Sequence, residues 1–588
     1  MHTFSIWAPR AHAVSVMLNG VSHPMLARSH GWWTADVASA QHGADYAFLL
    51  DDDTKPYPDP RSEWQPSGVH GLSRVLDHSR YVWHDAGFQA ASLSKAILYE
   101  LHIGTFTPEG TFAAAAARLA SLRDLGITHV QLMPVNSFPG RWGWGYDGAA
   151  LFAPQEAYGG PDALKGFVEA CHSSGLGVFL DVVYNHFGPD GNYTGRFGPY
   201  ITENHHTPWG GAVNLEERGS DEVRRFFCDN ALMWLRDYHF DGLRLDAVHS
   251  FVDRSAIHFL EQLSSEVEDL SREMGKHLVL IAESDLNDPR VVTPRASKEQ
   301  PGAGGYGIEA QWSDDFHHAL FAFLTGDRQS YYRDFGSLGQ LVKALTSVYV
   351  YDSIYSEYRG RNHGRPVGDL SAHHFLGYIQ NHDQVGNRGF GDRLHMAVGI
   401  KAAKLAAALV LTAPFVPMIF QGEEFAATSP FLYFADHDDP NLARAVSEGR
   451  RREHAPDGEW ESIPDPESQG TFERSKLNWA ERESAPHAEM LAWYRSLIHL
   501  RRSESSLWDG RLNHMRVRFD EVARWLIMER GSLHMLFNFS AKPVRLAVPE
   551  HSVILLSSEK DVLVVAEEID MPAQTFVTVA ANADRAQT

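Results

Sequence analysis

Cysteine is scarce in this chain of 588 residues, which contains only Cys171 and Cys228. Two cysteines cannot form the dense disulfide framework that stabilises small secreted domains. The scarcity favours a protein of a reducing compartment, and we expect a cytoplasmic location.

Basic residues are also few. Lys and Arg total 52 against 75 Asp and Glu, which gives a formal net charge of −23. An acidic surface repels phosphate backbones and anionic lipids, so the composition argues against nucleic acid and anionic membranes as main partners. We expect a soluble protein with a neutral or cationic ligand.

Long hydrophobic runs are missing as well. The longest, 405–420, is interrupted by Pro414 and Pro417 and is shorter than a membrane span of about 20 residues. The N-terminus lacks the basic and apolar segments of a secretory signal. We therefore predict no membrane span, and a helix that leads into a buried strand at 405–420.

The two ends of the chain have strand-like patterns. Residues 1–84 contain short runs with alternating polarity, such as Val14–Leu18, and turn residues such as Asn19 and Gly20 between them. This pattern predicts an N-terminal immunoglobulin-like β-sandwich. Similar runs return in residues 507–588 and predict a C-terminal all-β domain.

Between these ends, residues 85–506 alternate short apolar runs with helical patterns. The predicted strands are 97–101, 128–133, 177–183, 242–245, 278–282, 308–312, 375–379 and 416–420. Predicted helices include 112–125, which Gly126 ends, and 161–174, 221–238, 255–274 and 486–501. Eight β-then-α units predict an α/β fold, a (β/α)8 TIM barrel. A doubly wound open sheet is the alternative, but no G-x-G-x-x-G turn follows the first strand.

Acidic residues stand where several predicted strands end. They are Asp181, Asp246, Glu283 and Asp383, after strands three, four, five and seven. A TIM-barrel enzyme places its chemistry at these ends. One such residue is commonly a turn or helix cap, but four in one barrel are hard to explain in that way, so the set predicts a catalytic site.

Local context suggests different roles for these carboxylates. Arg244 and Asp246 are two apart on a strand and point to the same face, so the arginine should keep Asp246 ionised and nucleophilic. Apolar residues precede Glu283, and burial raises a carboxyl pKa, which suits a general acid. A glycosidase needs this pair of one ionised and one protonated carboxyl. Asp383 could hold a sugar hydroxyl, and Asp181 could be structural and orient Arg244.

Histidines form no metal-binding pattern. The pairs His205-His206, His317-His318 and His373-His374 lack further ligands at metal spacing, and a chain with 32 histidines contains such pairs by chance. The acidic runs 51–53 and 436–439 lack the final Glu of an EF-hand loop, and we interpret them as solvated turns. We predict no metal and no cofactor.

The strand ends resemble the four signature regions of the α-amylase superfamily of glycoside hydrolases. The matching segments are 181–186, 242–249, 281–284 and 381–383. The resemblance implies Asp246 as nucleophile, Glu283 as acid/base and Asp383 as transition-state stabiliser, with retention through a glycosyl-Asp246 intermediate. It also implies contacts in the −1 subsite from Tyr146, His186, Arg244 and His382, and structural support from Asp181 and Asn185.

Within this superfamily, three more stretches narrow the resemblance. Residues 140–160, 187–193 and 436–453 are similar to the maltooligosyltrehalose trehalohydrolase family. This implies cleavage of the α-1,4 bond next to a terminal trehalose unit, with release of trehalose and a maltooligosaccharide. It also implies work in sequence with an enzyme that forms maltooligosyltrehalose. The short segment 187–219 departs from α-amylases with a long calcium-binding insertion, so we expect no essential calcium.

A site that accepts trehalose needs polar and aromatic side chains near the barrel mouth. Asp314, His317 and His318, in a predicted loop after strand six, offer hydrogen-bond partners. Further candidates for hydroxyl contacts are His249, Gln384 and Asn387, and candidate walls are Trp209, Tyr358 and Arg359. For each of these the alternative is an ordinary loop or packing residue. Glu423 and Glu424 either line the mouth or begin a helix.

Two other functions fit the same layout. A branching or debranching enzyme shares the layout, and hydrolysis and transfer differ only in whether water or a sugar hydroxyl attacks the Asp246 intermediate. A catalytically inactive barrel could serve for binding, but such proteins usually lose a carboxylate, and all three are present here.

Overall fold

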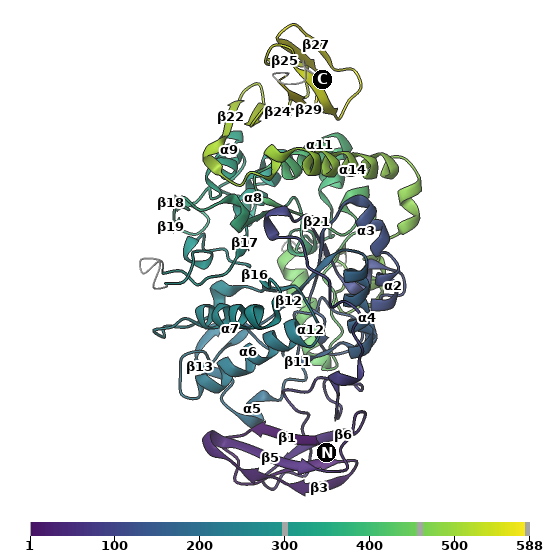
Figure 1. The fold of residues 1–588 in the computed structure, drawn as a ribbon, viewed down its shortest axis with the longest axis vertical. Coiled ribbons are helices and arrows are strands. Elements are labelled where there is room, and N and C mark those ends of the chain that lie inside the picture. The colour runs from purple at the N-terminus through teal and green to yellow at the C-terminus, as the bar shows by residue number, and fades with distance from the viewer. Residues whose placement is uncertain (1, 297–303, 455–461, 582–588) are drawn as a thin grey trace.

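Three β-containing parts lie along the long axis of the computed structural model, which describes residues 2–296, 304–454 and 462–581 (Figure 1). A β-sandwich lies at the N-terminal end, a barrel in the middle, and a β domain at the C-terminal end. The predicted fold class is confirmed.

Two antiparallel sheets form the N-terminal sandwich, in the orders β1-β5-β4 and β3-β2-β6-β7. The strands are β1 (His2–Trp7), β2 (Val14–Leu18), β3 (Val21–Pro24), β4 (Leu26–Ala27), β5 (Trp32–Val37), β6 (Asp45–Leu50) and β7 (Ser73–Arg74). Asn19 and Gly20 have φ of 48° and 82°, as a two-residue hairpin turn between β2 and β3 requires. The period-two pattern therefore predicted both the strands and this turn.

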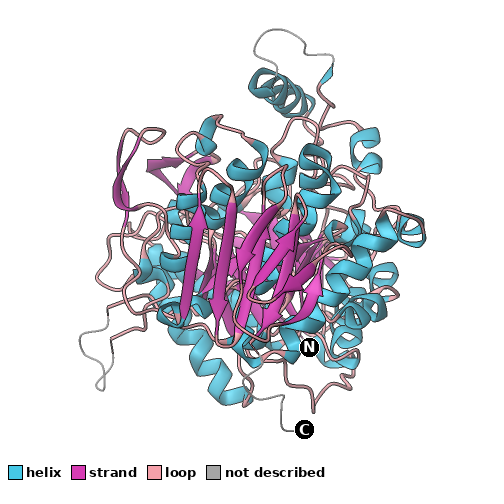
Figure 2. Cartoon of the chain, turned by 90° about the horizontal axis from the view of Figure 1, so that it is seen from above, coloured by secondary structure: helices cyan, strands magenta, loops and turns pink. Residues whose placement is uncertain are grey.

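Eight parallel strands close into the central barrel, in the order β12-β15-β16-β17-β20-β21-β8-β9. Figure 2 shows strands in the middle of the molecule with helices around them. They are β8 (Leu98–Leu101), β9 (His129–Leu132), β12 (Gly177–Val182), β15 (Gly242–Leu245), β16 (Val279–Ala282), β17 (Ala310–Trp312), β20 (Phe375–Gly377) and β21 (Val416–Phe420). Each predicted strand is present, and most are one or two residues shorter than predicted.

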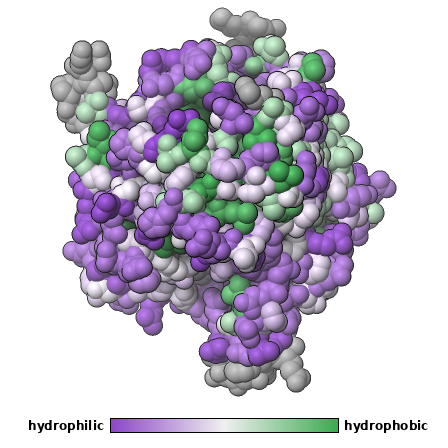
Figure 3. Space-filling model, turned by 90° about the horizontal axis from the view of Figure 1, so that it is seen from below, coloured by the Kyte–Doolittle hydropathy of each residue, from purple (hydrophilic) through white to green (hydrophobic). Residues whose placement is uncertain are grey.

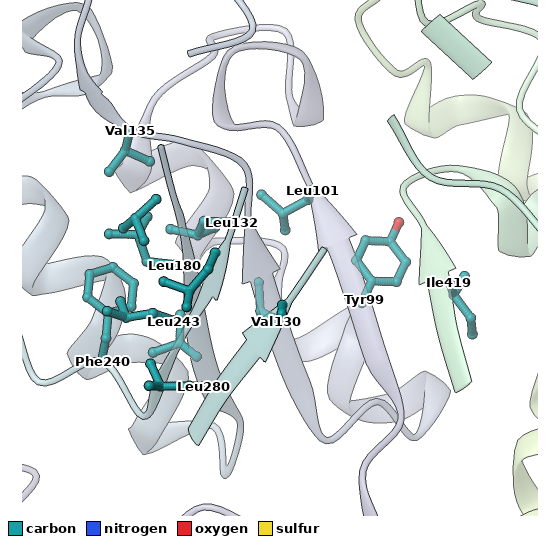
Figure 4. Packing of buried hydrophobic residues seen from close by; sticks show 14 of the residues in the cluster. Tyr99, Leu101, Val130, Leu132, Val135, Leu180, Phe240, Leu243, Leu280 and Ile419 are labelled. Carbon is teal, nitrogen blue, oxygen red and sulfur yellow. The ribbon is translucent and has the colours of Figure 1, made fainter. Parts of the chain in front are cut away.

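Side chains on these strands alternate between the two faces of the barrel wall. Leu180, Leu243 and Leu280 belong to the large apolar cluster outside the barrel (Figure 4). Phe179 and Ile281 belong to a separate cluster that fills the interior. The same alternation turns the side chains of Asp181 and Arg244 inward, toward the site.

Helices surround the barrel. The helices of the described chain are α1 (Ile103–Phe106), α2 (Phe112–Ala116), α3 (Leu119–Leu125), α4 (Gly160–Ser173), α5 (Thr194–Phe197), α6 (Ser220–Arg236), α7 (Phe259–Met274), α8 (Asp314–Thr325), α9 (Leu338–Ser347), α10 (His382–Gly386), α11 (Leu394–Thr412), α12 (Pro440–His454), α13 (Gln469–Arg474) and α14 (His487–Ser503). The predicted helix 112–125 is divided into α2 and α3 at Ala117 and Arg118. Gly126, with φ of 102°, ends α3 as predicted.

The apolar run 405–420 is a helix followed by a strand, α11 and β21, as predicted. By length and composition alone, α11 is the one helix of the described chain that could cross a membrane. Its residues 405–412 are all buried, and it packs against α8, α14 and β29. Arg501 of α14 donates to the carbonyl of Leu411 at 2.9 Å, which fits the negative end of a helix.

Two sheets form the C-terminal domain, in the orders β22-β23-β24-β29-β26 and β25-β28-β27. The strands are β22 (Met515–Asp520), β23 (Trp525–Arg530), β24 (Leu533–Asn538), β25 (Val544–Ala547), β26 (Val553–Ser557), β27 (Leu563–Val565), β28 (Glu568–Met571) and β29 (Thr575–Ala580). Arg530 of β23 donates to the carbonyls of Thr412 and Ala413, which ties this domain to the end of α11.

Three hairpins outside the barrel come from the connections between its strands. They are β10 (Asn136–Ser137) with β11 (Ala150–Pro154), β13 (Ile201–Thr207) with β14 (Gly210–Val213), and β18 (Asp352–Ser356) with β19 (Arg361–Gly364). Trp209 lies at the tip of the second, and Tyr358 and Arg359 lie at the tip of the third.

Seen from the N-terminal end, the surface is mostly hydrophilic with scattered hydrophobic side chains (Figure 3). Exposed Val21 and Leu26 lie on strands of the sandwich. Scattered apolar side chains of this kind are normal on soluble proteins.

Candidate active site

The three predicted catalytic carboxyl groups are among the acidic side chains that line one cavity of about 460 Å³. Asp246 directly follows β15, Glu283 directly follows β16, and Asp383 lies in α10 after β20. Because parallel strands of a closed barrel present their C-terminal ends on one side, residues far apart in sequence meet here. The structure thus brings together the three predicted catalytic residues.

Arg244 lies beneath the cavity and contacts three carboxyl groups. Its side chain is fully buried, and its Nη1 lies 2.7 Å from Asp181 Oδ2 and 2.8 Å from Asp246 Oδ1. Its Nη2 lies 2.8 Å from Glu283 Oε2. The guanidinium also lies over the Trp312 ring, 4.2 Å from the centroid, which fixes its orientation. A single buried cation is therefore shared by three carboxyl groups.

Asp246 is held by donors on both oxygens. Asn185 Nδ2 donates to Oδ2 at 2.7 Å, and Arg244 Nη1 donates to Oδ1 at 2.8 Å. Two donors, one of them a guanidinium, favour the ionised carboxylate. The geometry fits the predicted nucleophile, and it gives Asn185 the supporting position that we predicted.

Glu283 is in a different environment. Burial raises the pKa of its carboxyl, Arg244 opposes this effect, and Asp246 adds to it. The backbone N–H of Ala247 donates to Glu283 Oε2 at 2.8 Å. Ala247 has φ of 39°, an uncommon torsion for alanine, directly after the nucleophile. A carboxyl with a raised pKa is suited to give a proton.

The predicted −1 residues form one connected network. Tyr146 Oη donates to Asp181 Oδ2 at 2.7 Å and lies 2.7 Å from His382 Nε2. Burial raises the pKa of Asp181 to about 7, and the charge of Arg244 opposes this rise. Both oxygens of Asp181 accept hydrogen bonds from Arg244, which fits the ionised carboxylate. Arg244 and His382 lie beneath the lining of the cavity, whereas Tyr146 is part of it.

His186 lies at the edge of the same network. Its Nε2 is 3.1 Å from the Tyr146 carbonyl oxygen, and its ring stacks on Trp209, with centroids 5.3 Å apart and planes at 16°. Both residues line the cavity. The hairpin β13–β14 thus brings an exposed indole to the barrel mouth.

Most of the predicted acceptor-side residues also reach the cavity. Its lining includes His249, Asp314, His318, Gln384, Asn387, Trp209, Tyr358 and Arg359. Arg359 Nη1 is 3.0 Å from Asp285 Oδ2, which fixes the guanidinium at the wall. His249 Nδ1 is buried and has no hydrogen-bond partner within the described part of the chain. A buried polar atom of this kind is available to a ligand hydroxyl.

The chain is similar to known proteins over nearly its whole length. A family model described as the alpha amylase catalytic domain matches residues 81–204, and a domain of unknown function, DUF3459, matches residues 510–575. A malto-oligosyltrehalose trehalohydrolase from Rhizobium sp. (strain M-11) is 47% identical over 580 residues, 97% of this chain and 96% of that protein. The chain belongs to the malto-oligosyltrehalose trehalohydrolase family.

Two further proteins, the second described as a putative alpha amylase, are similar to this chain over nearly its full length. A malto-oligosyltrehalose trehalohydrolase from Mycobacterium tuberculosis (strain CDC 1551 / Oshkosh) is 46% identical over 570 residues, 96% of each chain. The crystal structure of a Salmonella typhimurium protein has a TM-score of 0.89 and 36% identity, and covers 98% of this chain and 97% of that one. The three-part layout is therefore shared over nearly the full length.

In this member of the trehalohydrolase family, the prediction for His317 is wrong. The segment 314–318 is the start of helix α8, not a loop. His317 is buried in the core, where Nε2 contacts the Tyr332 hydroxyl at 3.0 Å and Nδ1 contacts the Ile379 carbonyl at 2.5 Å. Burial lowers its pKa to about 3. It packs below the site and does not line the cavity.

Glu423 and Glu424 do not line this cavity either. They begin a short 3-10 helix after β21 and are buried, where Glu423 accepts from Tyr494 at 2.7 Å and Glu424 accepts from Tyr99 at 3.1 Å. Of the two interpretations of this pair, the helix start is the one that the structure supports.

Several lining residues of this trehalohydrolase-family site were missed from sequence. They include Asp147, Asp285 close to the end of β16, and Tyr331 and Tyr433, which lie on connections well past the strand ends. Glu100, which contacts His382 beneath the cavity, was also missed. A possible signal was present for Glu100, because it is an acidic residue inside an apolar strand.

Away from the lining, one group of described residues has the composition of an ion site. The ligand atoms of His70, Asp190 and Asp438 lie within 4.8 Å of one another. His70 Nε2 is 3.0 Å from Asp190 Oδ1, so imidazole and carboxylate already pair with each other. Asp190 also accepts the backbone N–H groups of Asp438 and Asp439, so the predicted solvated turn 436–439 is partly anchored. The absence of a metal stays a prediction.

Proposed function

We propose that this protein hydrolyses the α-1,4-glucosidic bond next to the terminal trehalose unit of maltooligosyltrehalose and releases trehalose and a maltooligosaccharide. The observation that carries the proposal is the near-complete coverage of relatives with this name at 46–47% identity, together with an intact set of three carboxylates at the cavity. A rival inactive barrel would have no need of that set.

The chemistry follows from the two environments of Asp246 and Glu283. Ionised Asp246 attacks the anomeric carbon while Glu283 gives its proton to the leaving oxygen of trehalose. Glu283 then takes a proton from water, which attacks the glycosyl-Asp246 bond and restores the enzyme. Both carboxyls lie 2.8 Å from the same guanidinium, which supports retention, because inversion needs room for a water between the two carboxyls.

The acid role of Glu283 predicts a pH dependence. On the natural substrate, kcat/KM should fall as the pH rises through the raised pKa of Glu283, because the proton to be donated is lost. Glu283→Gln should lower kcat/KM by about 10²- to 10⁴-fold on maltooligosyltrehalose.

An activated substrate provides the control for this prediction. With α-maltosyl fluoride, whose leaving group departs without a proton, the Glu283→Gln variant should form the glycosyl-enzyme at close to the wild-type rate. Equal losses in the single-turnover rates of fluoride release and trehalose release would contradict the acid role.

The hairpin β18–β19 predicts an effect on substrate binding. Tyr358 lines the cavity, and its removal in Tyr358→Ala should raise KM for maltooligosyltrehalose by about 3- to 10-fold through loss of ring contact with the sugar. Tyr355→Ala is the matched control, since Tyr355 is 61% exposed on the same hairpin and does not line the cavity. Equal KM changes in both variants would argue against a wall role for Tyr358.

The substrate separates this proposal from branching and debranching enzymes. The protein is incubated with maltooligosyltrehalose and, separately, with amylose or glycogen. We expect trehalose from the first and little cleavage or new branching in the second. Cleavage or branching of the glucans with no release of trehalose would overturn the proposed function.

The setting of the reaction is also part of the proposal. The substrate must come from an enzyme that converts the reducing end of a maltooligosaccharide to trehalose, so the two act in sequence. Both cysteines are free and buried, which supports a reducing, cytoplasmic location. The net charge of −23 supports function without nucleic acid or an anionic membrane.

A further inference from the structure

Glu100 places a buried carboxylate beneath the cavity, outside the set of catalytic residues. It lies on β8 between Tyr99 and Leu101, which belong to the outer apolar cluster (Figure 4), so its side chain turns into the barrel. Glu100 Oε2 accepts the backbone N–H of His382 at 3.0 Å, and Oε1 lies 2.8 Å from His382 Nδ1. Both oxygens therefore bind the same residue.

The other nitrogen of His382 faces Tyr146. A tyrosine hydroxyl has one proton, and Tyr146 donates it to Asp181 at 2.7 Å. Since Tyr146 Oη also lies 2.7 Å from His382 Nε2, this nitrogen must donate to it. Nδ1 faces a carboxylate and must donate as well. An imidazole that donates from both nitrogens is an imidazolium.

The groups around His382 agree with this charge. Glu100 faces the imidazole from β8. Tyr146, in the segment after β9, and Asp181, on β12, lie on its other side. Asp383 follows His382 in α10, and its Oδ2 lies 3.5 Å from His382 Nε2. The positive charge of Arg244 on β15 disfavours a second positive charge on His382. Burial lowers the pKa of the nearby His102 to about 3, so His102 is neutral. Burial lowers the pKa of His382, but Asp383 and Glu100 outweigh this and raise it to about 9.

We propose that Glu100 is a positioning residue that keeps His382 as an imidazolium in the −1 subsite, where the charge holds Asp383 ionised for the sugar hydroxyls. The Tyr146 ring stacks on His382 with centroids 5.1 Å apart, so the imidazolium has one fixed plane. This proposal rests on the proposed function for its substrate, because it concerns the same site.

The test compares Glu100→Gln with the wild type on α-maltosyl fluoride across pH 5 to 10. This substrate removes the need for a proton from Glu283, so the fall of kcat/KM at high pH reports the loss of the His382 proton. In the variant we expect this fall to move to lower pH by at least about one unit. At pH 7, kcat/KM should drop by about 10- to 100-fold.

Two further variants separate positioning from stability. Glu100→Asp retains the charge, and its kcat/KM should fall at the same high pH as that of the wild type. Glu424→Gln removes another buried carboxyl near the barrel mouth that does not line the cavity. It should leave the pH at which kcat/KM falls unchanged. The inference is overturned if kcat/KM of Glu100→Gln falls at the wild-type pH, or if Glu424→Gln shows the same shift to lower pH.

Failure of the proposed function looks different in the same experiments. It appears as absence of trehalose release from maltooligosyltrehalose by the wild type. The fluoride profile of the variants does not depend on that result, so the two outcomes are distinguishable.

Discussion

Asp246→Asn is expected to lower kcat by about 10⁴-fold or more on maltooligosyltrehalose and on α-maltosyl fluoride. The substitution keeps the size of the side chain, but its amide oxygen can accept from only one of the donors Asn185 and Arg244, and an amide cannot form the glycosyl-enzyme. The loss of glycosyl-enzyme formation from the fluoride distinguishes Asp246 from Glu283, whose replacement should spare this first step. Steady-state rates and mass spectrometry of the trapped intermediate provide the measurement.

A matched control for Asp246→Asn is Asp288→Asn. Asp288 is also largely buried and pairs with Arg290 at 2.6 Å, but it does not line the cavity. It should retain most activity. If Asp246→Asn kept more than about one per cent of kcat, a nucleophile other than Asp246 would be required.

Arg244→Ala is expected to lower the free energy of unfolding by about 3–5 kcal/mol at pH 8, because it leaves buried Asp181, Asp246 and Glu283 without their common cation. The pKa values of Asp181 and Glu283, which burial already raises, should then rise further. The folded variant would bind more protons than the unfolded one, so its stability falls as the pH rises. The deficit relative to wild type should therefore shrink at pH 5.

Denaturant unfolding at both pH values measures this difference. Arg290→Ala provides the control, because its side chain is 54% exposed and its pair with Asp288 should contribute little. A deficit in Arg244→Ala that stayed constant with pH would show that the lost packing against Trp312, not the lost charge, dominates.

Sequence patterns predicted the features that depend on local periodicity. The period of two on β15 placed Leu243 outward and Arg244 inward, and residue types at strand ends identified the three carboxylates. Glu100 was missed because its partner, His382, is 282 positions away and only barrel closure brings them together. Local sequence contains no information about that distance.

The error at 314–318 has another cause. A loop was predicted where α8 begins, and helix geometry then decides which side chains face the site. Asp314 and His318 are four apart and share one face, whereas His317 is turned by about 100° from His318 and packs into the core. Whether neighbouring residues share a face depends on the element that carries them, and the polar composition of the segment concealed the helix.

The two hairpins β13–β14 and β18–β19 have a consequence for protein engineering. Trp209 sits at the tip of one and Tyr358 and Arg359 at the tip of the other, and no strand of either hairpin belongs to the barrel sheet. Exchanging a hairpin for one of different length or sequence would therefore leave the hydrogen bonds that close the barrel unbroken. Libraries built in these two short segments could redirect this scaffold toward other sugar acceptors while the bond-breaking carboxylates stay in place.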